Sequence, residues 1–234
     1  MNGVSQNPVV IIPGVLFWDS FYDPMKEVLA GYLSRERVAV APVTLVDWTG
    51  FPPSPEKSTN RVMKVVDGAV REMERKFPNE PVTLVAHSGG GTVAMIYLLE
   101  EPFQGDVYRT RGRVSKLVTL GTPFHTHERY AKIKTDFIFS HLQKDFFERC
   151  RVVSVACDKY HGNDDGGFVE KMCFKFYRSV QENGRVGGDG IVPAESCFLE
   201  GAENVTIADA GHLPTPHTRW YGTKEGIKQW IQWL

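Results

Sequence analysis

The residues whose types and spacing could do chemistry gather first around Ser88. An apolar segment, Val82 to Ala86, leads into this serine, and three glycines follow it directly. A serine on so tight a strand-to-helix turn needs strained backbone angles, so the residues two before and two after it must be small; here they are Ala86 and Gly90. Such a turn would point the N–H of Gly89 at a developing oxyanion. Ser88 is therefore a candidate nucleophile, although an ordinary strand, turn and helix would share the pattern.

Two aspartates and two histidines could complete a proton-transfer system with Ser88. Asp158 stands at the end of an apolar segment, whereas Asp189 lies in the phrase Gly-Gly-Asp-Gly-Ile-Val-Pro. We prefer Asp189, because glycines on both sides would let its carboxylate turn inward toward a histidine. His212 follows a glycine just past the last predicted strand, and His217 comes five residues later. We prefer His212 because it is closest to the strand end.

A sheet of parallel strands would have to position these residues. Continuous apolar runs are typical of strands buried on both faces, and they predict strands at Val9–Ile12, Val38–Val43, Val82–Ala86, Ser115–Leu120, Arg151–Ala156 and Asn204–Ala208. Helical spacing of apolar residues predicts helices from Asp23 onward and at Ser58–Phe77, Thr92–Glu100, Phe168–Gln181 and Ile227–Leu234. Prolines deny regular hydrogen bonding to Thr44–Lys57, so we expect a surface loop there, near the strand ends. The pattern favours the α/β class.

Two phrases at predicted strand ends carry a family resemblance. Leu-Gly-Thr-Pro follows the strand at Ser115–Leu120, and Pro13-Gly14 follows the first strand. With the turn at Ser88, they resemble α/β-hydrolases of the lipase and esterase type, similar in pattern to small microbial lipases and to the lipase-like part of GPI inositol deacylases. The resemblance implies a minimal α/β-hydrolase fold of about six mostly parallel strands with helices on both faces. It also implies one domain over residues 1–234, with a short insertion at about 125–149 where such enzymes carry a cap or lid.

The resemblance assigns roles to the candidate residues. The order Ser88, Asp189, His212 is the order in which α/β-hydrolases carry their triad. In that family the residue after the glycine of the first turn supplies a second oxyanion N–H, here Val15 beside Gly89. Ser88 would attack an acyl carbonyl while His212 takes its proton, and water would release the acid through an acyl-enzyme without a cofactor. Side chains near the expected site that could bind substrate are Phe17, Trp18, His87 and Phe124.

We therefore predict a serine hydrolase that cleaves carboxylic esters, with a small acyl ester as its partner. Thioesterase or acyltransferase activity on the same triad is the alternative. A non-catalytic binding or receptor module that retains the hydrolase pocket is an alternative of another class, because a fold alone does not establish activity. The segment Ile133 to Phe147 is apolar on more than one face, and we expect it to form a fixed covering helix rather than a moving lid.

Composition limits the partners and the compartment. The net charge of −1 and the pI near 6.7 give no field that would gather nucleic acid or an acidic membrane. We expect no nucleic-acid binding and no stable membrane insertion. His125 and His127 have the spacing of a metal pair but no assignable third ligand, so no metal is expected.

The cysteines point to a reducing compartment. All four lie in or beside apolar segments without Cys-x-x-Cys spacing, which favours buried free thiols. No secretory leader is visible at the amino terminus. We expect a cytoplasmic or other reducing location, including an organelle such as the chloroplast if a leader was removed.

Overall fold

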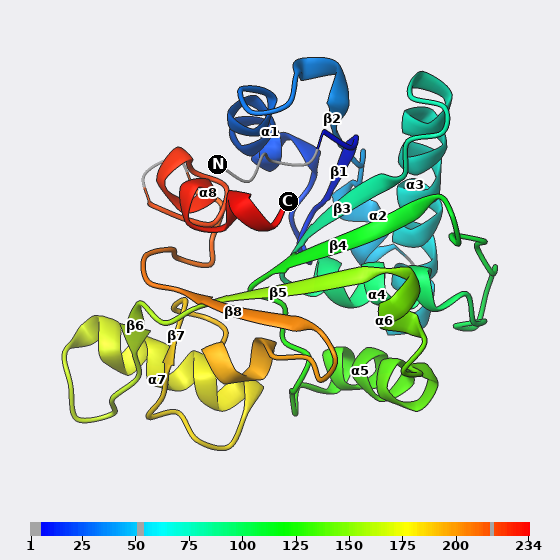
Figure 1. Ribbon diagram of the computed structural model, residues 1–234. Helices are drawn as coiled ribbons and strands as arrows, with labels where there is room; N and C mark the ends of the chain where they lie inside the picture. Colours follow the sequence, from blue (N-terminus) through cyan, green and yellow to red (C-terminus); the bar gives the residue numbers. More distant parts are fainter. Residues whose placement is uncertain (1–5, 51–53, 216–217) are drawn as a thin grey trace.

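The computed structural model describes residues 6–50, 54–215 and 218–234, and a six-stranded sheet forms its centre (Figure 1). The strands are β1 (Val9–Ile12), β2 (Val38–Val40), β3 (Val82–His87), β4 (Val114–Leu120), β5 (Arg151–Cys157) and β8 (Glu203–Ile207). Their order in space is β2-β1-β3-β4-β5-β8, and every pairing is parallel. The predicted α/β fold class with six parallel strands is confirmed.

Side chains alternate between two cores along the strands. Val10 and Ile12 of β1 belong to one core with α3 (Pro55–Lys76), α4 (Gly89–Leu99), α5 (Arg129–His141) and α6 (Phe146–Arg149). Val9 and Ile11 belong to the other, with α1 (Asp23–Ala30), α8 (Lys224–Trp230) and the 3-10 turn η4 (Ile231–Trp233). In Figure 1, α1 and α8 lie together on one side of the sheet, away from α3, α4 and α5. A sheet covered on both faces explains why its strands are continuous apolar runs.

The segment expected to be a surface loop, Thr44–Lys57, instead contains helix in its described residues. In α2 (Leu45–Thr49), the Asp47 carboxylate accepts from the N–H of Thr44 at 2.7 Å and from its hydroxyl at 2.6 Å. α3 begins at Pro55, and the Ser54 hydroxyl accepts from the Lys57 N–H at 3.1 Å. The prediction was wrong because proline fits the first turn of a helix, where its missing N–H has no partner to lose. Pro52 and Pro53 lie outside the described residues.

The helix predicted at Phe168–Gln181 is confirmed, but it belongs to a small unit between β5 and β8 whose two short strands were not predicted. β6 (Tyr160–His161) and β7 (Gly187–Gly188) pair antiparallel, and α7 (Phe168–Val180) connects them. This excursion brings the chain back to the end of β5 immediately before Asp189. Short 3-10 turns complete the described elements: η1 (Asp19–Tyr22), η2 (Arg35–Arg37) and η3 (Ala194–Cys197).

Two further properties concern membranes and thiols. Among the helices that the structure describes, none is both long and apolar enough to cross a bilayer. All four cysteines are buried and carry free thiols, and burial raises the pKa of Cys157 to about 11. These thiols are packed as small apolar groups.

Candidate active site

Ser88 connects the end of β3 to the start of α4 through a strained turn. Its φ of 52° and ψ of −132° lie in a region that costs a side-chain-bearing residue about 1–3 kcal/mol. The end of β4 holds the turn in place: the Ser88 N–H donates to the Leu120 carbonyl at 2.8 Å, and the Thr122 hydroxyl donates to the Ser88 carbonyl at 2.8 Å. A Cβ on Gly90 would lie 2.4 Å from the Pro13 carbonyl oxygen. Gly90, two residues after Ser88, and the Leu-Gly-Thr-Pro phrase thus both serve the turn.

His212 and Asp189 extend from Ser88 as one hydrogen-bonded chain. The Nε2 of His212 lies 2.8 Å from the Ser88 Oγ, and its Nδ1 lies 2.7 Å from the Asp189 Oδ2. An ionised carboxylate only accepts, so Nδ1 carries the proton and Nε2 has a lone pair for the serine hydroxyl. The exposed fraction is 5% for His212 and 2% for Asp189. The structure brings together the three residues that the sequence order suggested.

Four donors surround the Asp189 carboxylate. Its Oδ1 accepts from the N–H groups of Ile191 at 3.1 Å and Val192 at 2.8 Å. Its Oδ2 accepts from His212 and, at 3.1 Å, from the hydroxyl of Tyr221. Burial raises the pKa of Tyr221 well above its ordinary value, which keeps this hydroxyl protonated as a donor. Sequence reasoning missed Tyr221, because nothing near it in the chain points to Asp189.

The rival acid and base occupy different positions. The Asp158 side chain is 47% exposed, and its Oδ1 lies 3.6 Å from the Nε2 of His161. A Cβ on Gly187 would lie 1.5 Å from that same oxygen, so Asp158 faces β7. His217 lies outside the described residues.

Val15 and Gly89 lie side by side next to Ser88. The Val15 side chain covers Gly89 so closely that a Cβ on the glycine would lie 2.4 Å from the Val15 Cγ2. A turn presents Val15: the Phe17 N–H donates to the Gly14 carbonyl at 3.1 Å, and Leu16 has a φ of 66°. Within the described residues, neither the Val15 N–H nor the Gly89 N–H donates to a backbone carbonyl outside helices and strands. These are the two N–H groups that the family resemblance assigned to an oxyanion.

His87 and Tyr22 support this turn from the protein interior. The Tyr22 hydroxyl accepts from the Gly14 N–H at 2.8 Å and lies 2.7 Å from the His87 Nδ1. Burial lowers the pKa of His87 well below its ordinary value, and the nearby His212 lowers it further. His87 is therefore neutral, and its Nδ1 can accept from Tyr22. Because it is only 1% exposed, His87 is not positioned to touch substrate as the sequence analysis suggested.

A cavity of about 250 Å³ opens beside Ser88. Its walls are Val15, Trp48, Ser54, Pro55, Ser58, Ser88, Gly89, Pro123, Glu128, Tyr130, Ala131 and Lys134. The aromatic residues expected here lie elsewhere: Phe124 is fully buried in the core, while Phe17 and Trp18 pack on Phe21 with ring centroids 5.2 and 4.5 Å apart. Trp48 lines the cavity instead, with its Nε1 donating to the Phe17 carbonyl at 2.9 Å. It was missed because its segment was interpreted as a loop.

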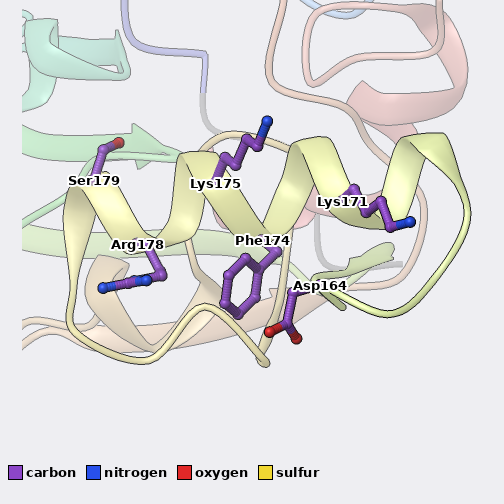
Figure 2. Close-up of a pocket in the computed structure, with 6 residues that line it drawn as sticks. All are labelled: Asp164, Lys171, Phe174, Lys175, Arg178 and Ser179. Carbon is purple, nitrogen blue, oxygen red and sulfur yellow. The ribbon is translucent and has the colours of Figure 1, made fainter.

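A separate hollow lies against α7, away from the Ser88 cavity (Figure 2). Figure 2 shows Lys175 and Ser179 pointing to the opposite side of the helix from Phe174 and Asp164, so the side chains do not converge on a ligand. Ser88, His212 and Asp189 are not among the residues that line this hollow. A group of three or more histidine, cysteine or acidic side chains that could hold a metal is also absent from the described residues.

Comparison with known proteins agrees with this architecture. Residues 7–155 match the family model of the alpha/beta hydrolase fold. The product of a Listeria innocua gene is similar over 97% of this chain and 94% of its own, with 16% identity and a TM-score of 0.52. An alpha-beta serine hydrolase homologue from Coxiella burnetii is similar over 97% of this chain and 84% of its own, with 10% identity and a TM-score of 0.53. A Paleococcus ferrophilus monoacylglycerol lipase is similar over 97% of this chain and 95% of its own, with 13% identity and a TM-score of 0.51.

These likenesses differ in what they establish. At identities this low, the solved structures indicate a common fold and nothing about substrate. No protein of curated function matches the sequence. The family model, however, covers more than half of the residues and includes the turn at Ser88. The chain belongs to the α/β-hydrolase family.

Proposed function

We propose that this protein is a serine hydrolase that cleaves carboxylic esters. The observation that supports the proposal most strongly is the chain of hydrogen bonds from Ser88 through His212 to Asp189, at 2.8 and 2.7 Å. These distances are within the reach that nucleophile, base and orienting acid require. Ser88 gives its proton to Nε2 of His212 as its Oγ attacks the acyl carbonyl. Asp189 holds the imidazole in the required tautomer and stabilises its charged form.

The oxyanion of the tetrahedral intermediate is received by the N–H groups of Val15 and Gly89. Each such donor is worth about 10² to 10³ in turnover number when it is preorganised. Preorganisation is supported by the contact between Val15 and Gly89 and by the hydrogen bond from Gly14 to Tyr22. His212 then returns the proton to the leaving alcohol, and water hydrolyses the acyl-enzyme by the same path.

We also propose that residues 1–234 form one hydrolase domain, with α5 and α6 as a fixed cover of the cavity. Thr135 and Ile138 of α5 are buried, and Ile138 belongs to the same core as α3 and α4. Moving α5 would expose this apolar surface, at a cost of about 25 cal/mol for each Å². That packing favours a fixed helix over a moving lid.

An active-site probe tests the proposal. The purified protein should hydrolyse p-nitrophenyl butyrate, and a fluorophosphonate should label it at Ser88. Ser88→Ala should lose both properties, while Ser140→Ala, an exposed serine on α5, should keep them. Labelling that persists in Ser88→Ala would contradict the assigned nucleophile. A folded wild-type protein that neither hydrolyses the ester nor reacts with the probe would favour a binding module instead.

A further inference from the structure

A buried lysine lines the cavity at Ser88 and takes no part in the proposed mechanism. Lys134 of α5 is 6% exposed. Its Nζ lies 3.7 Å from the point where a Cβ on Gly89 would stand. The lysine therefore reaches the wall that Gly89 forms beside Ser88 in the cavity.

Lys134 has no anionic partner within the described residues. No salt bridge or hydrogen bond to its Nζ is found there, and the carboxylate that acts on it electrostatically is Glu128. Glu128 is committed to capping α5: its two carboxylate oxygens accept from the N–H groups of Tyr130 and Ala131 at 3.0 and 2.7 Å. An ammonium group buried without a partner is costly. A bound anion that pairs with the Lys134 ammonium group would offset this cost.

The rest of the cavity offers little to compete with Lys134. Trp48, Pro55 and Pro123 are apolar walls. The polar side chains of Ser54 and Ser58 are engaged locally, since the Ser54 hydroxyl accepts from the Lys57 N–H and the Ser58 hydroxyl donates to the Pro55 carbonyl. Among the described lining residues, Lys134 is the sole cation and Glu128 is the sole carboxylate, and both oxygens of Glu128 already accept from backbone N–H groups. An anion that entered would therefore be attracted to the position beside Gly89.

We propose that Lys134 determines substrate specificity, and that the ester cleaved at Ser88 carries a carboxylate or phosphoryl group a few bonds from its scissile carbonyl. This inference rests on the proposed function. The anionic group pairs with Nζ and so replaces the missing protein partner. A charge-assisted hydrogen bond in such a position changes affinity by about 10- to 100-fold.

Matched esters test this specificity. For the acyl side, monomethyl glutarate and methyl phosphonobutyrate are compared with methyl valerate, and for the alcohol side acetoxypropanoate is compared with propyl acetate. Proton release gives kcat/KM for each. At least one anionic ester should exceed its neutral match by about 10-fold or more. The arm that shows the preference identifies the anion and its side of the ester.

Variants assign the preference to Lys134. Lys134→Met should bring the ratio of anionic to neutral kcat/KM close to one, and Lys134→Arg should retain most of it. Lys132→Met is the control, because that exposed lysine pairs with Asp136 at 2.6 Å on the helix surface. If Lys134→Met lowers both esters of a pair equally, Lys134 acts on the common carbonyl and the proposal is overturned. A wild-type protein without any preference overturns it as well.

Binding to Ser88→Ala separates this proposal from the proposed function. Titration calorimetry of each anionic ester and its neutral match measures the preference without turnover. Tighter binding of the anion that disappears in Ser88→Ala/Lys134→Met supports the lysine site even if the wild-type protein hydrolyses neither ester. Equal binding in both proteins refutes the lysine site even if the wild-type protein is an active esterase.

Discussion

Replacing Lys134 by methionine should make the protein more stable at neutral pH. Methionine has a similar length and no charge, and so it removes an ammonium group that is buried without a partner. Burial lowers the pKa of Lys134 from its ordinary value of 10.5 to about 8, although Glu128 opposes this shift. A difference of this size between the folded and unfolded pKa corresponds to about 3 kcal/mol of destabilisation by the charged form. Lys134→Met should recover that amount at pH 7.

The gain should depend on pH in a defined window. Below about pH 8, Lys134 is protonated in both the folded and the unfolded protein, so the whole destabilisation is present. Between about pH 8 and 10.5 the unfolded chain binds more protons than the folded one, and the stability of the wild-type protein rises relative to the variant. The advantage of Lys134→Met should therefore shrink across this window and vanish above it.

Denaturant unfolding of the two proteins at several pH values measures the difference. Other titrating groups are common to both proteins and cancel. Lys132→Met serves as the control, because this exposed lysine should change the unfolding free energy by less than about 1 kcal/mol. The reasoning is refuted if Lys134→Met is less stable than the wild-type protein at pH 7, or if the gap is the same at pH 7 and pH 10.

Four further substitutions test other parts of the structure. Asp189→Asn should lower kcat by about four powers of ten: Oδ1 accepts two backbone N–H groups, so the new amide would present its NH₂ to His212 and force the wrong tautomer. Asp158→Asn should cost far less, and the reverse ranking in ester assays would move the acid to Asp158. Tyr221→Phe removes one of four donors to the carboxylate, and kcat/KM should fall roughly tenfold without loss of the fold by circular dichroism. Asp67→Asn should cost about 2 kcal/mol of unfolding free energy at pH 7. Burial would raise the pKa of Asp67, but hydrogen bonds from two arginines and a tyrosine lower it overall from 3.8. The stabilisation that ionised Asp67 provides is therefore present above pH 3.8 and is lost as the pH falls through the lower pKa of the folded protein. In urea unfolding, the difference in unfolding free energy between the wild-type protein and Asp67→Asn should narrow near pH 3.

The sheet could be predicted from sequence because its strands are buried on both faces. Such strands are continuous apolar runs, and β1 was predicted with both of its ends. β2 ends earlier than predicted, at Val40. The Ala41 N–H still donates to the Ile11 carbonyl at 2.9 Å, but Pro42 has no N–H to continue the ladder. Apolar character extends past this point, whereas hydrogen bonding does not.

The candidate nucleophile was visible in the sequence because its turn is a local structure. Strained angles at Ser88 require small residues two positions before and two positions after it, and that requirement leaves a readable pattern. Lys134 and Tyr22 left no such pattern. Their significance depends on contacts with Gly89 and His87, which lie far away in sequence and meet them only in the fold. A lysine in a helix is usually exposed, so its burial could not be inferred from its neighbours.

The candidate acid is held by more of the molecule than the candidate nucleophile is. The Asp189 carbonyl accepts from the N–H of His212 at 2.9 Å, which ties the acid and the base together through the backbone as well as the side chains. In the next residue, the Gly190 N–H donates to the Tyr177 hydroxyl at 3.0 Å, and that hydroxyl donates to the Tyr160 carbonyl at 2.8 Å. Tyr177 of α7 thus links the acid loop to β6.

This arrangement gives the excursion between β5 and β8 a role at the site. Ser88 is fixed by the two central strands, through Leu120 and Thr122, and His212 directly follows the turn after β8. Asp189 instead follows the segment formed by β6, α7 and β7. Because β7 contacts β5, this segment returns the chain to the sheet next to His212. Disturbing α7 at Tyr177 would therefore displace the carboxylate while leaving the serine turn intact. The excursion thus supports the imidazole, because it carries the carboxylate that contacts His212, whereas Asp158 at the end of β5 faces β7.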